Sequence, residues 1–278
     1  MTEISPLSCA ELPFTSGPLL ALETSARVGS VALATWEGHG SNPVLRVLGS
    51  RRLEEEEEHA SLLLPRIGEL LATVGIGPGG LGGVIVGAGP GSFTGIRVSV
   101  ATAKGMARSL GIPLWAYSSL AAAVMDSPGQ EGEEETGTSE EGSASPPREF
   151  PFVSAVRCVL FDARGDRVYA AAYRAQSTGL QAILKPAATT VSEICGGLIP
   201  VGTLLMGDGA ARHRAVLEDS GFEVLLPPAG RPTAEGLLRL HALNPETPAL
   251  SDPGPWEPDY LRASGAERMR RTRDGLGA

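Results

Sequence analysis

The apolar residues of this chain recur in two patterns, one typical of strands and one of helices. Short runs rich in valine, isoleucine and leucine are bounded by turn residues, which predicts strands. Between 62 and 74 the apolar residues recur every three or four positions, which predicts a helix. A second helix is expected over 96–110. In this first part of the chain the predicted strands are 19–23, 28–35, 44–50, 84–86 and 113–117.

A similar order of elements returns in the second part of the chain. A strand over 153–161 leads through turn residues at 162–166 into a strand over 168–175, which predicts a hairpin. A hairpin followed by strands that alternate with helices, present twice, predicts an α/β protein with two similar halves. The later elements are expected to be a helix at 191–197, a strand at 204–207, and helices at 209–219 and 233–243.

Composition changes abruptly between the two parts. Residues 126–150 are mostly glycine, serine, proline and glutamate, and such a segment buries too little apolar surface to fold, so we expect a disordered acidic insertion. The expected organisation is a disordered tail, an N-terminal α/β domain joined by the 233–243 helix, a second α/β domain that contains the insertion, and a C-terminal extended segment with a basic tail. The tail covers residues 1–17, the N-terminal domain 18–118 and the second domain 119–232. The C-terminal segment with its basic tail covers 244–278.

Charge is concentrated in two segments. Residues 126–149 hold eight acidic residues and one arginine, which account for −7 of the net charge of −9. The remainder is therefore close to neutral, which argues against a nucleic-acid-binding domain. Five arginines between 262 and 273 form either a solvated tail or a contact for phosphate.

Several sequence features indicate a cytoplasmic protein that does not contact membranes. No apolar run has the length of a membrane span, and residues 1–17 have neither the basic start nor the hydrophobic region of a signal peptide. The three cysteines, Cys9, Cys158 and Cys195, are odd in number and widely spaced, which fits a reducing compartment and predicts neither a disulfide framework nor a metal site.

A glycine-rich turn at 87–95 is the most distinctive stretch of the chain. It matches neither of the two standard phosphate-binding patterns, because Ser92 stands where one needs glycine and Ile96 where the other needs lysine. Glycines allow close approach to the backbone, and a helix start offers free N–H groups to an anion. The turn is therefore either a packing device or an anion site, and both interpretations remain open.

Small residues recur along the helix that follows the turn. Ser99, Ala103 and Ala107 lie four residues apart, and a neighbouring stripe contains Ala101, Gly105 and Ser109. Small residues at this spacing allow a second element to approach closely. The helix is therefore expected either to pack tightly on its own sheet, which spacing alone favours, or to form an interface with another subunit.

The chain has few residues arranged for catalysis. None of the four histidines lies three or four positions from another, so no pair shares a helix face around a metal. Three carboxylates, Glu23, Asp162 and Asp208, follow strands, where they either hold a metal–nucleotide between two halves or act as turn residues. Lys104, one of only two lysines, is interpreted as a surface charge.

These motifs together resemble the TsaB family, the non-catalytic relative of TsaD in bacterial threonylcarbamoyladenosine modification of tRNA. The resemblance runs in order from about residue 19 to 262, with the acidic insertion and both tails outside it. It includes His59 with Leu62–Pro65. The other matching segments are LLALETS (19–25), GSVAL (29–33), GPGSFTG (89–95), DAR (162–164) and EPDYLR (257–262).

The resemblance implies the α/β fold of actin, sugar kinases and heat-shock chaperones (ASKHA), with two similar halves of mixed sheets flanked by helices. TsaD-like catalytic proteins carry a cysteine and two acids where this chain has Ala26–Val28, and a second histidine where it has Leu63. Both differences remove groups that metal–nucleotide chemistry requires. We therefore expect a pseudo-enzyme with no catalytic residues, metal or cofactor. Weak nucleotide-binding candidates are Glu23, Ser25, Gly89 and Gly91.

The resemblance also implies a set of partners. The helices at about 57–74 and 95–110 would form a bundle with the matching helices of a TsaD-like catalytic subunit, and a homodimer when the chain is alone. A TsaE-like ATPase would dock on the pair, and tRNA would be contacted only through the complex. Replacing Ala103 by a large residue is expected to block pairing and leave the fold intact. The expected contact residues are His59, Leu63, Ile67, Ile96, Ser99, Ala103 and Ala107.

The scaffold role has two competitors. One is a metallopeptidase, and the absence of a histidine pair argues against it. An active ATP-dependent phosphotransferase or ATPase would have the same class of fold. Two observations argue against it: the loss of acids at Ala26–Val28, and the absence of a lysine from the glycine-rich turn. We therefore expect a subunit that supports threonylcarbamoyl transfer to the adenosine next to the anticodon and performs no chemistry itself.

Overall fold

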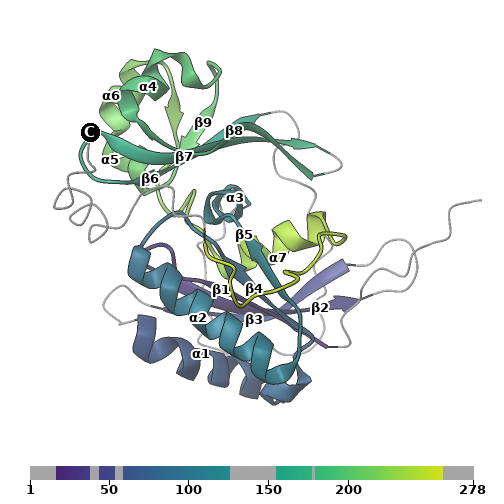
Figure 1. Cartoon of the computed structure of the whole chain (residues 1–278). Coiled ribbons are helices and arrows are strands. Elements are labelled where there is room, and N and C mark those ends of the chain that lie inside the picture. Colours follow the sequence, from purple (N-terminus) through teal and green to yellow (C-terminus); the bar gives the residue numbers. More distant parts are fainter. Residues whose placement is uncertain (1–16, 38–43, 54–58, 126–154, 177–178, 259–278) are drawn as a thin grey trace, which may run out of the picture.

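The computed structural model describes residues 17–37, 44–53, 59–125, 155–176 and 179–258. The described part contains two five-stranded mixed sheets with helices packed on them (Figure 1). The predicted N-terminal tail, except for Gly17, lies outside the described residues. So do the acidic insertion at 126–150 and the arginines from 262 onward.

The first sheet is formed by the N-terminal part of the chain. Its strands are β1 (Leu19–Glu23), β2 (Gly29–Glu37), β3 (Val44–Leu53), β4 (Gly83–Gly87) and β5 (Leu114–Tyr117). The first three pair antiparallel, and β4 and β5 continue the sheet in parallel, in the order β3-β2-β1-β4-β5. The helices of this part are α1 (His59–Val74), the short 3₁₀ turn η1 (Pro78–Gly80) and α2 (Phe93–Leu110).

The second sheet repeats this topology. Three antiparallel strands are followed by two parallel ones, in the order β10-β9-β6-β7-β8, so β6 takes the central place that β1 has in the first sheet. The two similar halves expected from the sequence are confirmed. The elements are β6 (Val156–Asp162), β7 (Arg167–Gln176), β8 (Gly179–Thr190), α4 (Val191–Glu193), η2 (Ile194–Leu198), β9 (Leu204–Met206), α5 (Asp208–Arg212), α6 (Arg214–Asp219) and β10 (Glu223–Val224).

The structure corrects three of the predicted elements. The prediction missed β8, the longest strand, and β10. The single helix expected over 209–219 is divided at His213 into α5 and α6. Bulges interrupt the pairing of β7 with β8, and β8 lies at the edge of its sheet, so its burial follows no regular alternation.

The central strand β1 is buried on both faces. Leu20 and Leu22 pack against α1 and α2, whereas Leu19 and Ala21 face a core that reaches the second sheet. That second core contains α3 (Ser119–Val124) and α7 (Ala234–Leu243), which lie between the two sheets (Figure 1). Because every side chain of β1 is covered, the strand reads as a continuous apolar run without alternation.

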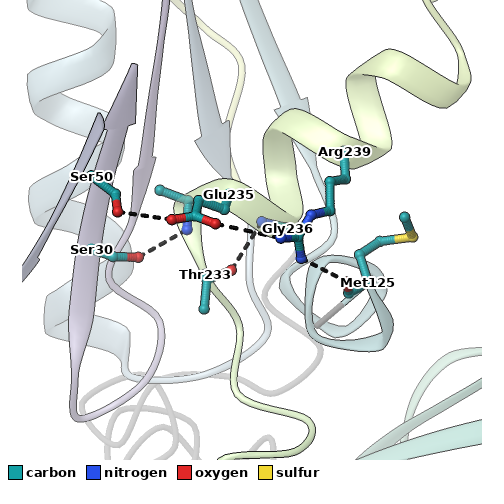
Figure 2. Close-up of polar contacts among 8 residues, drawn as sticks. Ser30, Ser50, Met125, Thr233, Glu235, Gly236 and Arg239 are labelled. Atoms are coloured by element: carbon teal, nitrogen blue, oxygen red, sulfur yellow. Dashed lines mark hydrogen bonds and ion pairs between the residues drawn. The ribbon is translucent and has the colours of Figure 1, made fainter. Parts of the chain in front are cut away.

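Polar contacts fasten α7 to elements on both sides of it (Figure 2). Thr233 caps the helix through its side chain, as the sequence predicts. The Ser50 hydroxyl on β3 donates to Oε1 of Glu235 at 2.8 Å, and Nη1 of Arg239 donates to the Met125 carbonyl after α3 at 3.0 Å. The α7 helix is thereby held both to the first sheet and to the end of α3.

A buried histidine on α7 lies among aromatic rings. His241 is 3 % exposed, and its ring centroid is 4.9 Å from that of Trp115 and 6.1 Å from that of Trp36. Its Nδ1 is 2.9 Å from the Tyr117 hydroxyl. Burial away from water lowers the pKa of His241 to about 4, because the charged imidazolium loses its hydration there.

This depressed pKa predicts a loss of stability in mild acid. The unfolded chain protonates His241 near its ordinary pKa of 6.5, whereas the folded chain resists protonation until about pH 4. The stabilisation is complete above pH 6.5 and is lost as the pH falls toward 4, by about 3 kcal/mol in total. Denaturant titrations of the wild type and of His241→Gln at pH 4.5, 5.5 and 7 measure the difference. Equal pH dependence of both proteins would refute this assignment.

Candidate functional site

The site begins at the end of β1, where the chain buries a carboxylate. Glu23 is only 1 % exposed. Its Oε1 accepts from the Ser25 N–H at 2.7 Å, and its Oε2 accepts from the Ser119 hydroxyl at 2.8 Å. Burial raises the pKa of Glu23, and hydrogen bonds from Ser25 and Ser119 oppose that effect. The carboxylate thus serves as an internal anchor between β1 and α3.

The glycine-rich turn packs directly against this anchor. A Cβ added to Gly87 would come well inside 3.0 Å of the Glu23 carboxylate, so any side chain there would displace this anchored group. The Ser119 hydroxyl also accepts from the Gly89 N–H at 3.1 Å. Ser119 therefore links Glu23 to the turn. This role of Ser119 was not predicted, because its only signal in the sequence is its place shortly after the predicted strand over 113–117.

Two further glycines bring the start of α2 onto the loop after β1. An added Cβ at Gly91 would overlap the Ser25 carbonyl, and one at Gly95 would overlap the Thr24 carbonyl, both well inside 3.0 Å. The Ser92 N–H donates to the Ser25 carbonyl at 2.6 Å. Because these glycines carry no side chain, the two backbones can meet here. This geometry favours the packing device over the anion site as the interpretation of the turn.

The N–H groups of Ser92, Gly95 and Ile96, at the start of α2, are bonded within the chain. Ser92 caps the helix by accepting from the Gly95 N–H at 3.2 Å, and the Ile96 N–H bonds to the Ser92 carbonyl. The structure thus brings the candidates Glu23, Ser25, Gly89 and Gly91 together. An anion site there stays a prediction, and the bonded N–H groups argue for packing.

The corresponding carboxylates of the second half act as turn residues. Asp162 Oδ1 accepts from the Arg164 N–H at 2.9 Å, and its Oδ2 lies 2.7 Å from Nη1 of Arg212. Asp208 Oδ1 accepts from the Gly209 N–H at 2.9 Å and from the Asp162 N–H at 3.2 Å. Arg164 has a φ of 72°, which the hydrogen bond to Asp162 supports.

Most of the predicted contact residues on α1 and α2 are buried in the structure. Ala103 is 0 % exposed, and the Ser99 hydroxyl donates to the carbonyl of the preceding turn. These small residues face the sheet and let α2 approach it closely. Because Ala103 is fully buried, a large residue at 103 would disturb the fold, and the contact of this stripe with a partner stays a prediction. The buried positions are Leu63, Ile67, Ile96, Ser99, Ala103 and Ala107. The side chain of His59, at the start of α1, lies outside the described residues.

The outward side of the same two helices carries a second set of small residues. Leu64 on α1 is 60 % exposed, and a Cβ added to Gly68 or Gly105 would meet nothing within 4 Å. The two helices lie side by side on one face of the sheet, so their exposed residues form one surface (Figure 1). We call this surface the small-residue face. It comprises Leu64, Gly68 and Ala72 on α1 and Ala101 and Gly105 on α2.

The structure also revises the interpretation of Lys104. Its side chain is half-buried, and Nζ donates to the Gly254 carbonyl at 3.0 Å and to the Trp256 carbonyl. The ammonium lies 5.6 Å from the centroid of the Trp256 ring. Lys104 is therefore an anchor for the C-terminal segment rather than a solvated surface charge.

The described residues contain neither a cluster of metal-binding side chains nor a helix that could span a membrane. Within residues 17–258, apart from the gaps given above, no three His, Cys, Asp or Glu side chains come close enough to hold a metal ion. Among the helices in those same ranges, none combines the length and apolar character needed to cross a bilayer.

Comparison with known proteins identifies a matching family and solved structures with a similar fold. Residues 53–217 match the family model described as TsaD: tRNA N6-adenosine threonylcarbamoyltransferase. A solved structure from Pseudomonas aeruginosa, described as an uncharacterized protein with similarity to peptidase YEAZ, is 24 % identical, with a TM-score of 0.64. YeaZ from the same organism is 23 % identical with the same TM-score, and each match covers 88 % of this chain and 100 % of the other. These likenesses confirm the predicted fold class. No curated protein matches the chain.

Proposed function

The chain belongs to the tRNA N6-adenosine threonylcarbamoyltransferase family, TsaD, with YeaZ (TsaB) as its structural neighbour, and from this we propose that it is a non-catalytic scaffold subunit. The family relates it to the formation of threonylcarbamoyladenosine in tRNA. Its role would be to bind and support a TsaD-like catalytic subunit, which transfers the threonylcarbamoyl group to the adenosine next to the anticodon.

The small-residue face is the observation that carries this proposal. Gly68 and Gly105 have open space above them, and Ala72 and Ala101 add only a methyl group each. Helices pack at interaxial distances of about 8–10 Å, with the shortest distances where the side chains are small. Leu64 adds an exposed apolar side chain beside these positions. Such a surface is suited to a second pair of helices and has no evident use in an isolated chain.

Arginines border the face on α2. Arg97 and Arg108 are exposed, and the guanidinium of Arg97 lies 4.3 Å from the centroid of the Phe93 ring. Charged residues around an apolar centre mainly control specificity and the rate of encounter. We expect the partner's matching helices to present acidic side chains opposite Arg97 and Arg108, and small residues opposite Gly105.

The packed loop and turn support a structural rather than a chemical role. Gly91 and Gly95 allow α2 to seat on the backbone of Thr24 and Ser25, and the Ser92 N–H is bonded there. This contact fixes the position of α2, which carries half of the face. The close approach of these backbones supports a packing role for the turn over a role as a phosphate cradle.

The remaining partners follow from the same proposal. A TsaE-like ATPase would dock on the pair, and tRNA would be contacted through the complex. When the catalytic subunit is absent, two copies of this chain would pair through the same face. The homodimer and the heteromeric complex would then be mutually exclusive, because both cover the residues around Gly105.

Mixing the chain with a TsaD-like subunit tests the proposal directly. We expect one new peak in size-exclusion chromatography and saturable heat in calorimetry, with loss of the homodimer peak. Sub-micromolar affinity corresponds to a binding free energy of about −8 kcal/mol or better, a level that standard-sized interfaces reach. Separate elution of the two proteins at tens of micromolar would contradict it.

A further inference from the structure

The segment after α7 returns across the first half of the molecule. It appears as the yellow segment that leaves α7 in Figure 1. We call residues 245–258 the C-terminal strap. The Thr247 carbonyl accepts from Nε1 of Trp115 at 2.9 Å, and the Leu250 N–H donates to the Leu114 carbonyl at 2.8 Å. Leu114 belongs to β5, an edge strand, so the strap covers part of an otherwise open sheet edge.

Lys104 locks the far end of the strap to α2. Its ammonium group donates to two strap carbonyls, those of Gly254 and Trp256, and lies over the Trp256 ring. The side chains of Leu250 and Trp256 pack against the core beneath α1 and α2. Lys104 thus makes both hydrogen bonds and a ring contact with the strap where the strap meets α2. We call these contacts of Lys104 the lock.

The lock lies at the border of the small-residue face. Lys104 follows Ala101 by three positions and Gly105 follows Ala101 by four, so both are neighbours of Ala101 on the surface of α2. Ala101 and Gly105 are exposed, whereas Lys104 is half-buried by the strap. The strap therefore runs along one edge of the face and limits the directions from which a helix can approach.

We propose that the C-terminal strap is a second component of the docking surface and that Lys104 is the residue that positions it. The inference rests on the proposed function, because it concerns the surface that receives the catalytic subunit. With the lock closed, the strap holds α2 and presents Trp256 beside the face to the partner. With the lock open, Trp256 leaves its place and the partner loses that contact.

The chain allows a clean test because Lys104 and Lys185 are its only lysines. Lys185 is exposed on β8, in the other half of the molecule. Brief acetylation of the native protein, read by mass spectrometry, compares the two ammonium groups. We expect Lys104 to react at least about tenfold more slowly than Lys185, since two hydrogen bonds hold its ammonium group. Trp256→Ala should raise the Lys104 rate toward that of Lys185. Equal rates in the wild type would overturn the lock.

Binding variants then test the positioning role. Lys104→Met removes the ammonium and keeps the aliphatic stem, and we expect it to weaken binding of the TsaD-like subunit about tenfold, mainly through faster dissociation. Lys104→Arg, which also donates to carbonyls, should restore most of the affinity. Lys185→Met is the matched control and should bind as the wild type does.

The possible failures are distinguishable. If Lys104→Met lowers thermal stability but binds the partner with unchanged affinity, the strap is only structural and the inference is overturned. If the wild type itself does not bind a TsaD-like subunit, the proposed function fails. The acetylation rates would still decide whether the lock exists. Slow Lys104 acetylation together with a tenfold loss in Lys104→Met and rescue by Lys104→Arg supports the inference.

Discussion

Gly95→Ala is expected to lower the free energy of unfolding by at least about 3 kcal/mol, at the upper end of the usual cost of overpacking. The added methyl group would overlap the Thr24 carbonyl, well inside 3.0 Å. This contact is between two backbones, and the Thr24 hydroxyl also donates to the Gly95 carbonyl at 2.7 Å. Neither side can move without displacing the start of α2 or the end of β1. Denaturant titration at neutral pH measures the change.

Gly105→Ala is the matched control on the same helix. Gly105 is exposed and its added Cβ would meet nothing within 4 Å, so the change should stabilise the protein by about 0.5–1 kcal/mol through helix propensity. If Gly95→Ala lowers the free energy of unfolding and Gly105→Ala raises it, the close contact at Gly95 is the cause of the loss. Equal effects of the two variants would mean that the turn does not pack on the loop as described.

A pair of tryptophan substitutions should separate partner binding from folding. Ala101→Trp adds bulk to the small-residue face, where it should leave stability within about 0.5 kcal/mol and weaken binding of the TsaD-like subunit at least about 100-fold. Ala103→Trp adds the same bulk to a side chain that is 0 % exposed. It should destabilise the fold by more than about 3 kcal/mol or prevent folding altogether.

Both variants are read by circular dichroism, thermal unfolding and calorimetric titration with the partner. Ala101→Trp should remain folded and unable to bind. A folded Ala101→Trp that binds with wild-type affinity would exclude the small-residue face as the docking surface. A stable, well-folded Ala103→Trp would show that the inner stripe of α2 is not a packed contact.

The spacing of apolar residues predicted most of the helices and strands. It failed for elements whose side chains follow no regular alternation. The strands around Val84 and the helix over 62–74 were predictable because burial on one or both sides controls their composition. The strand β8 was not, because Lys185 and Pro186 lie in a bulged edge strand that is only partly covered. Such residues protect an edge from pairing and at the same time hide it from pattern analysis.

The site shows a different limit of sequence reasoning. Small residues at four-residue spacing serve equally for packing on a sheet and for meeting another helix. The pattern at Ser99 and Ala103 suggested an interface, whereas the structure buries these two residues against the sheet and exposes the neighbouring stripe at Ala101 and Gly105. The glycine-rich turn was similarly ambiguous, because only the position of the Ser25 carbonyl distinguishes close packing from an open cradle. The bonds of Lys104 join residues 150 positions apart and leave no local trace.

The central claim is that this chain supports chemistry performed by another subunit. The most direct measurement is threonylcarbamoyl transfer to tRNA, assayed with this chain alone, with the TsaD-like subunit alone, and with both together with the TsaE-like ATPase. We expect no product from this chain alone, little from the catalytic subunit alone, and rapid modification when they are combined. Modification of tRNA by this chain alone, or full activity of the catalytic subunit without it, would exclude a scaffold role for this chain.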